Sequence, residues 1–342
     1  MPLRFERHQK TARYLDPRAD FQETAVSCEL RRDPLTGRSG RVAHFVGFHV
    51  QPPDLTEQIE LSRTNCPFCP DRVLNVTPRF PAEVVAEGRV QRGETVLFPN
   101  LSPYDEHSAV AALSREHYVP ITGFTPHLLR DGFEASAAYF RAVERQPRTD
   151  YGLLMWNYLP ASGGTQIHPH FQLFATDTPG NTLEREAAAA ADYYQQEGRV
   201  YWDDLLHEEE RQGERFIARG RHSAWLASFI SQSMLGDTLI VFPGQRTLTD
   251  LPAEALDELC LGLTQALAAF ATQGIYSFNL ATFPATPGRG DAWLRFRLSP
   301  RLYLVPRLWA PDTSTLQHLY DEHYMVQAPE EMAAQLRATI RL

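Results

Sequence analysis

The stretch GGTQIHPHFQLFAT, residues 163–176, carries two histidines on either side of a single proline. Because alternate side chains of an extended strand point to the same face, we expect His168, His170 and Gln172 to project together. Pro169 cannot donate a hydrogen bond to a sheet ladder, so this segment is predicted to be an edge or exposed strand. Polar groups aligned on such a strand, beside a turn made by two glycines, indicate a functional site in preference to a packed core.

The composition is that of a globular enzyme. The chain has 342 residues, of which 43% are hydrophobic and 22% charged, enough for one large domain or two ordinary ones. A net charge of −9 argues against a general binder of polyanions, so we expect no nucleic-acid partner. The first residues lack the apolar stretch of a signal peptide, and no apolar run reaches membrane-spanning length. We therefore expect a cytoplasmic protein with no membrane partner.

A second motif, CPFC, places Cys66 and Cys69 three positions apart. Such a pair fits either a dithiol redox centre, which needs a helix directly after it, or half of a tetrahedral zinc site. Pro70 follows at once, and VLNVTPRFP (73–81) does not read as a helix, which favours zinc. Two more ligands are then required, and the candidates are His127 and His168. With four protein ligands the zinc would be structural, with no position open for water.

The order of predicted elements indicates two copies of one unit. Strands, a helix, a strand, a glycine turn and a strand come first, and the order returns after a helical connector. The clearest elements are helices over 128–146 and 252–274 and a strand over 151–159. We therefore predict an α+β fold with a catalytic half at 1–180 and a second half at 181–342 that lacks the histidine motif. The alternative is an ordinary α+β chain that divides by chance into similar pieces.

Several short motifs together resemble the galactose-1-phosphate uridylyltransferase family of the histidine-triad superfamily, which includes related nucleotide-sugar phosphorylases. They are RRDPLTG (31–37), CPFCP (66–70), FPN (98–100), TPH (125–127), GGTQIHPHFQ (163–172) and LYDEHYMVQAPEEMAAQLR (319–337). The resemblance implies that each unit is histidine-triad-like, so that the duplicated fold is pseudo-symmetric. It also implies a homodimer.

The resemblance further implies a double-displacement nucleotidyl transfer through a covalent His170 intermediate. Gln172 replaces a third histidine of hydrolytic relatives, and an amide can hold a phosphoryl oxygen but cannot shuttle a proton. The expected zinc ligands are Cys66, Cys69, His127 and His168. The expected substrate contacts are Asn100 to the nucleoside, and Asn157, Thr165 and the backbone amides of Gly163 and Gly164 to the phosphates.

The chain also departs from the family pattern. Phe171 stands where a glycine is usual, and an expected arginine pair is missing, so Arg63 is a candidate phosphate contact instead. The strand LRFRLSPR (294–301) lacks the His-x-His of a second metal site, so we expect none there.

Three functions follow as hypotheses. The first is transfer of a nucleoside monophosphate, with uracil or adenine as base, from a nucleotide sugar to a sugar 1-phosphate. The second is a phosphorylase that uses inorganic phosphate on a nucleotide sugar or a dinucleoside polyphosphate. The third is a zinc-stabilised module that binds a nucleotide without turnover.

Overall fold

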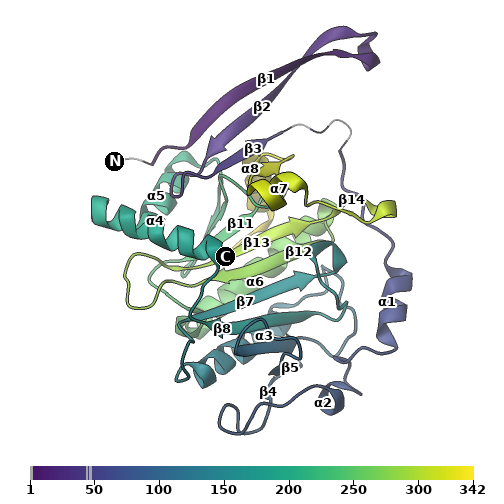
Figure 1. The fold of residues 1–342 in the computed structure, drawn as a ribbon, viewed down its shortest axis with the longest axis vertical. Helices are drawn as coiled ribbons and strands as arrows, with labels where there is room; N and C mark the ends of the chain where they lie inside the picture. The colour runs from purple at the N-terminus through teal and green to yellow at the C-terminus, as the bar shows by residue number, and fades with distance from the viewer. Residues whose placement is uncertain (1–2, 44, 46–47) are drawn as a thin grey trace.

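A ten-stranded antiparallel sheet runs through the computed structural model, which describes residues 3–43, 45 and 48–342 (Figure 1). Each strand pairs with its neighbours in antiparallel register. In sheet order the strands are β4 (Val90–Arg92), β5 (Thr95–Pro99), β6 (His107–Ala112), β8 (His170–Thr176), β7 (Tyr151–Tyr158), β12 (Ser277–Phe283), β13 (Leu294–Arg301), β11 (Thr238–Phe242), β10 (Ala224–Ala227) and β9 (Phe216–Arg219).

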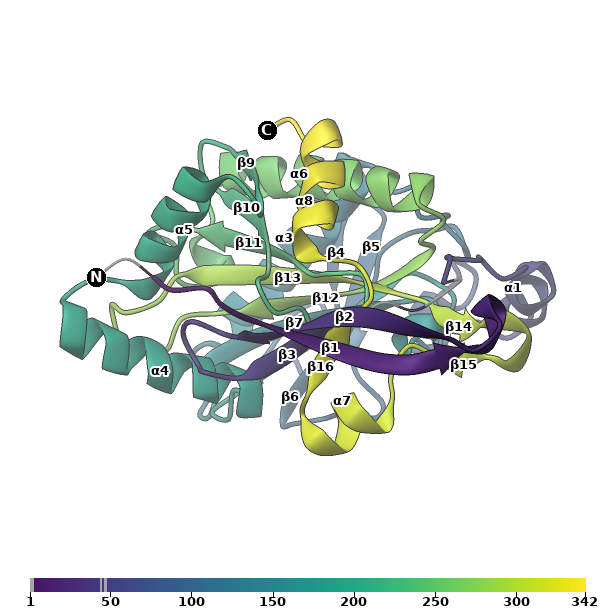
Figure 2. The same ribbon diagram turned by 90° about the horizontal axis from the view of Figure 1, so that it is seen from above.

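One face of this sheet is covered by long helices. Strand alternation sends Phe171 of β8 and Trp156 of β7 into a core shared with α3 (Pro126–Val143) and α6 (Ala253–Thr272). α8 (Pro329–Thr339) packs on α6 (Figure 2). Gly132 makes room for the Phe171 ring, because a Cβ at that position would lie 2.9 Å from a ring carbon. Phe171 is therefore a packing residue whose ring points away from the face that carries His170.

The opposite face is only partly covered. A four-stranded sheet lies over its C-terminal half together with α4 (Asn181–Glu197) and α5 (Tyr201–Gln212) (Figure 2). Its strands are β1 (Glu6–Asp16), β2 (Gln22–Arg32), β3 (Ser39–Val42) and β16 (His323–Met325), and the β1–β2 hairpin projects from the body (Figure 1). The remaining α-helices and strands of the described residues are α1 (Thr56–Arg63), α2 (Val73–Val76), α7 (Thr315–Tyr320), β14 (Tyr303–Val305) and β15 (Ala310–Pro311).

The predicted α+β class is confirmed, and the long elements match closely. α3 begins at Pro126, where the Thr125 side chain accepts a hydrogen bond from the Leu128 amide and caps the helix. Among the described residues, no helix combines the length and the apolar character needed to cross a bilayer.

The prediction of an edge or exposed strand was wrong. β8 lies between β6 and β7 in the middle of the sheet, and the side chains of His168 and His170 are buried. Pro169 directly precedes the first residue of β8, and its carbonyl accepts from the Leu113 amide at 3.0 Å. The missing proline N–H therefore interrupts no ladder. The segment after Cys69 was also predicted without helix, whereas α2 forms one short turn there.

Candidate functional site

Four buried side chains meet beside the start of β8, and their ligand atoms all lie within 4.8 Å of one another. The Cys69 Sγ is 3.5 Å from Nδ1 of His117 and 3.8 Å from Nδ1 of His168. The Cys66 Sγ is 3.6 Å from the same His168 nitrogen. We call Cys66, Cys69, His117 and His168 the Cys2His2 cluster.

Both imidazoles of the cluster are held in the tautomer that a metal requires. His168 Nε2 donates to the Ser114 carbonyl at 2.8 Å, so the lone pair lies on Nδ1, which faces the sulfurs. The Ser62 hydroxyl donates to the Ile59 carbonyl, so its oxygen accepts from His117 Nε2 at 2.9 Å. Such partners on the outer nitrogen are typical of metal-binding histidines, where they fix the ring orientation.

The spacing fits a tetrahedral ion. Zinc bonds of about 2.3 Å to sulfur and about 2.0–2.1 Å to nitrogen give ligand-to-ligand distances of roughly 3.3–3.8 Å. The sulfur-to-nitrogen distances of 3.5, 3.6 and 3.8 Å fall in that range. Burial, and then the neighbouring Cys66, raise the pKa of Cys69 to about 12, so the thiol stays protonated until a cation displaces its proton. Two sulfur and two imidazole donors match zinc better than calcium or magnesium.

The fourth ligand predicted from the sequence, His127, was wrong and is corrected to His117. His127 lies in the first turn of α3 with its side chain 84% exposed, 3.8 Å from the Asp131 carboxylate. His117 follows β6, and Ala112 of β6 pairs with His170 of β8. The chain just after β6 therefore lies beside the chain just before β8, a neighbourhood set by the strand pairing.

His170 lies two residues after the cluster ligand His168, and one of its ring nitrogens is fixed. Its Nδ1 lies 2.9 Å from the His168 carbonyl oxygen, which can only accept, so Nδ1 carries the proton. Burial lowers the pKa of His170, which favours the neutral ring. The residue as a whole is 7% exposed. The lone pair is therefore on Nε2, the arrangement of a neutral nitrogen nucleophile.

Phe68, between the two cysteines, connects the cluster to the strand. Its ring centroid is 5.3 Å from that of His170 and 6.0 Å from that of His168. It is also 5.5 Å from Phe98 of β5, within a small apolar group on this side of the sheet. The CPFC motif was interpreted from its sulfurs alone, so the contact between Phe68 and His170 was not predicted.

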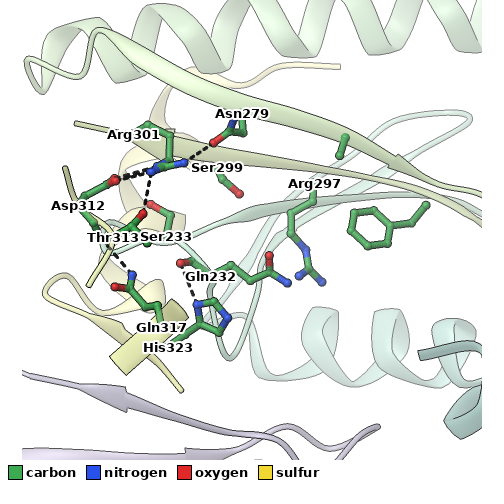
Figure 3. A pocket seen from close by; sticks show the side chains of 12 residues that line it. Gln232, Ser233, Asn279, Arg297, Ser299, Arg301, Asp312, Thr313, Gln317 and His323 are labelled. Atoms are coloured by element: carbon green, nitrogen blue, oxygen red, sulfur yellow. Dashed lines mark hydrogen bonds and ion pairs between the residues drawn. The ribbon is translucent and has the colours of Figure 1, made fainter. Parts of the chain in front are cut away.

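A chain of side-chain hydrogen bonds, which we call the amide relay, runs from Gln172 across the sheet. Asn157 Nδ2 donates to Gln172 Oε1 at 3.1 Å, and Asn279 Nδ2 donates to Asn157 Oδ1 at 2.6 Å. Arg301 Nη1 donates to Asn279 Oδ1 at 2.7 Å, and its guanidinium binds Asp312 through two nitrogens (Figure 3). The relay fixes the amide of Gln172, leaving its NH2 group as the donor. Its last three members come from separate segments of the C-terminal half, and no sequence spacing pointed to them.

The backbone amides of Gly163 and Gly164, which were predicted to bind phosphate, donate to carbonyl groups of their own turn. The Gly163 N–H donates to the Pro160 carbonyl at 2.9 Å and the Gly164 N–H to the Leu159 carbonyl at 3.3 Å. Both amides are therefore used within the turn. Gly164 is instead needed for space, because a Cβ there would lie 2.6 Å from the Asn157 carbonyl oxygen.

The other residues predicted to contact the substrate differ in their exposure to solvent. Thr165 is exposed just after the turn. Asn100 is half-buried beyond the end of β5, where its Oδ1 accepts from the Ser102 amide at 3.0 Å. Arg63 is the last residue of α1, and its side chain is exposed. Its guanidinium lies 3.3 Å from the Glu60 carboxylate.

Comparison with known proteins links this geometry to a known fold. No protein-family model matches the chain. An uncharacterized protein of Archaeoglobus fulgidus is 30% identical over 311 residues, covering 90% of this chain and 91% of that one, and the two belong to one family. A galactose-1-phosphate uridylyltransferase of Streptomyces lividans is 26% identical over 231 residues, covering 66% of this chain and 59% of that one.

Solved structures extend the likeness to nearly the whole chain. An ADP-glucose phosphorylase of Arabidopsis thaliana, solved with bound ADP-glucose, has a TM-score of 0.69 at 16% identity, covering 93% of this chain and all of that one. A uridylyltransferase has a TM-score of 0.65 at 19% identity, covering 90% of this chain and 97% of that one. The chain has the fold of the galactose-1-phosphate uridylyltransferase-like proteins. The family resemblance read from the sequence motifs is confirmed.

The corrected ligand set predicts that substitution of His117 and substitution of His127 differ in their effect on zinc affinity. Loss of an outer-shell partner alone costs about 10–100-fold in metal affinity, so His117→Ala should weaken zinc binding by at least about 100-fold. His127→Ala should bind zinc like the unchanged protein, because its ring is exposed and outside the cluster. Zinc content after dialysis against a competing chelator measures both. Equal retention by the two variants, or loss in His127→Ala alone, would show that the cluster is not the metal site.

Proposed function

We propose that the protein is a nucleotidyltransferase that passes a nucleoside monophosphate through His170, from a nucleotide sugar to a phosphate acceptor. The observation that carries the proposal is the fixed Nδ1 proton of His170, which leaves a neutral nitrogen lone pair on Nε2. A neutral nucleophile approaches an anionic phosphate without the repulsion that an oxyanion meets. A phospho-imidazole is also reactive, so both half-reactions stay accessible.

The two half-reactions balance without an added base. Nε2 attacks the α-phosphorus, the bond from that phosphorus to the bridging oxygen breaks, and the sugar 1-phosphate leaves with the electron pair. The Nδ1 proton stays on the ring, where the His168 carbonyl stabilises the imidazolium that forms. An oxygen of the acceptor phosphate then attacks the same phosphorus, and the bond to Nε2 breaks.

The Cys2His2 cluster holds this geometry. We propose zinc as its ion, and four protein ligands would leave no position for a reactive water, so the zinc would act as a structural cross-link. The ring of His168 would be tied to both cysteines, and its carbonyl is the group that orients His170. A metal held there would act on the chemistry only through the position of the His168 carbonyl.

Gln172 favours phosphate acceptors over water. Its NH2 group, fixed by the bond from Asn157 to its oxygen, can donate to a phosphoryl oxygen and stabilise charge there. It cannot take a proton from water, whereas an acceptor phosphate arrives already deprotonated. Both a hexose 1-phosphate and inorganic phosphate meet this condition. The first is our primary proposal, and the ADP-glucose phosphorylase of like fold supports the second.

We also propose that the two halves, 1–180 and 181–342, are copies of one histidine-triad-like unit. The strand order of the sheet supports this. From one edge the first half runs β4-β5-β6-β8-β7, and from the other edge the second half runs β9-β10-β11-β13-β12. In both series, the last of the five strands in chain order lies between the third and the fourth. α3 and α6 occupy the same place in each sequence of elements. β13, the counterpart of β8 in the second half, carries no histidine, and its Arg295 and Arg297 are bound to Glu186. We therefore assign the chemistry to the first half.

We also propose a homodimer, on the family resemblance alone.

A covalent label tests the nucleophile. Incubation with UDP-glucose or ADP-glucose labelled in the α-phosphate should leave an acid-labile adduct on His170, located by peptide mass spectrometry. His170→Asn should lose it, because an amide nitrogen has no available lone pair. The matched control is His127→Asn, which should label fully. Equal labelling of His170→Asn and the unchanged protein would overturn the mechanism, and tight nucleotide binding with no label and no exchange would favour the non-catalytic binding module.

Substitution of Gln172 tests the choice of acceptor. Gln172→His places a proton acceptor beside the adduct, and general-base assistance is worth about 100-fold or more. We therefore expect water to discharge the labelled enzyme about 100-fold faster, measured as decay of label without an acceptor. Gln172→Leu removes the amide without adding a base and should show no such gain. Equal decay in both variants would mean that residue 172 does not decide between water and phosphate.

A further inference from the structure

A cavity of about 780 Å³ lies beside β4, the edge strand of the large sheet (Figure 1). Its volume is within the range of pockets that bind small molecules. The lining comes from α2, from the loop between α2 and β4, from β4 itself and from α3. None of the residues assigned to the candidate site around His170 lines this cavity.

Strand register places the cavity on the face of the sheet that points away from the candidate site. Val90 of β4 pairs with Leu97, and Leu97 pairs with Ala111. Ala111 in turn pairs with Phe171, so this row of side chains ends in the core beneath α3. Arg92 follows Val90 by two positions and therefore projects to the same face. The sheet itself separates a ligand bound here from the reactive histidine.

Three arginines line the cavity, against one carboxylate, that of Glu87. They are Arg79, Arg89 and Arg92. Within the part of the chain that the structure describes, none of the three guanidinium groups forms an ion pair. The protein as a whole carries a net charge of −9, so this group of cations is a local exception. Such a concentration of one sign of charge attracts anions.

Arg89 is the most firmly held of the three. The residue is 8% exposed, and its Nε donates to the Thr77 hydroxyl at 3.2 Å. Its Nη2 donates to the same hydroxyl at 3.1 Å and to the Thr77 carbonyl. The hydroxyl in turn donates to the Val73 carbonyl of α2. Both partners of the guanidinium are neutral, so a buried positive charge lacks a counter-ion among the described residues, and Nη1 is left to bind a ligand.

A closed loop brings Arg79 beside Arg89. The Phe80 amide donates to the Gly88 carbonyl at 2.8 Å, which draws together the residues on either side of that bond. Gly88 has a φ of +73°, and a Cβ there would lie 3.2 Å from the Arg79 Cβ, so glycine permits the close approach. Burial, and then the neighbouring Arg79, lower the pKa of Arg89. An anion between the two guanidinium groups would relieve their mutual repulsion.

The lining indicates which anion fits. Guanidinium groups match phosphate well, because their N–H donors form a planar fork and a phosphate accepts from several donors at once. The cavity is larger than a phosphate ion, and Val84, Ala138 and Ala142 give it an apolar surface. These features favour a phosphate group that is attached to a carbon skeleton.

We propose that this cavity is a second binding site, for a small organic phosphate whose phosphate group is held by Arg79, Arg89 and Arg92. The site is separate from the one around His170 and does not depend on the nucleotidyl transfer proposed above. Arg89 and Thr77 connect it to α2, and the Val73 amide at the start of α2 donates to the Cys69 carbonyl at 2.8 Å. The site therefore adjoins the segment that follows the cluster cysteines.

Single arginine substitutions test this assignment. Arg79→Gln and Arg92→Gln each remove one charge from an exposed residue, so both variants should fold, and thermal unfolding checks that they do. The matched control is Arg221→Gln, which removes an exposed charge between β9 and β10 at the opposite edge of the sheet. Calorimetry at constant ionic strength measures the dissociation constants of phenyl phosphate and of inorganic phosphate.

We expect phenyl phosphate to bind more tightly than inorganic phosphate, and each of Arg79→Gln and Arg92→Gln to weaken its binding by about 10-fold, because each removes charge-assisted hydrogen bonds. Arg221→Gln should bind it like the unchanged protein, and labelling of His170 by a nucleotide sugar should persist in all three variants. The proposal is overturned if the unchanged protein binds neither probe, if both cavity variants bind phenyl phosphate normally, or if Arg221→Gln loses as much affinity as they do. Equal affinity for the two probes would contradict the assignment to an organic phosphate.

Discussion

The hydrogen bond between His170 Nδ1 and the carbonyl of His168 is the interaction on which the site depends. It fixes the tautomer of His170 and the direction of Nε2 at once. The bond joins residues only two positions apart, so its geometry follows the backbone at His168. That backbone is held from two directions, by the ring of His168 against the cysteines and by the Pro169 carbonyl in the ladder to Leu113. The buried Cys2His2 cluster and the imidazole of His170 are thus linked through one short stretch of backbone.

A second constraint is the shared sheet. β7 of the first half pairs with β12 of the second, which allows Asn157 and Asn279 to meet side by side. The amide that orients Gln172 is consequently fixed by residues from both halves. This strand pairing brings together the side chains that align Gln172.

The sequence predicts the candidate site best where residues adjacent in the chain decide the arrangement. The spacing in HPHFQ predicted that His170 and Gln172 share a face, and CPFC predicted a thiolate pair, because both follow from neighbouring residues alone. It failed where long-range pairing decides. His117 was not predicted as a ligand, because its closeness to His168 comes from the pairing of β6 with β8. His127, in the TPH motif, was predicted instead, but it lies exposed at the start of a helix. The relay through Asn279 and Arg301 was out of reach for the same reason. The prediction of an edge strand failed at Pro169, because a proline just before a strand and a proline inside one look alike in sequence.

The proposed chemistry of His170 depends on which nitrogen of its ring carries the proton. Nitrogen-15 NMR of the zinc-loaded protein, with His170 assigned by its loss in His170→Asn, reports which imidazole nitrogen carries the proton. We predict a neutral ring protonated on Nδ1 at neutral pH, with Nε2 showing the shift of an unprotonated nitrogen. A ring protonated on Nε2, or a doubly protonated imidazolium, would contradict the account, because neither leaves a lone pair on Nε2.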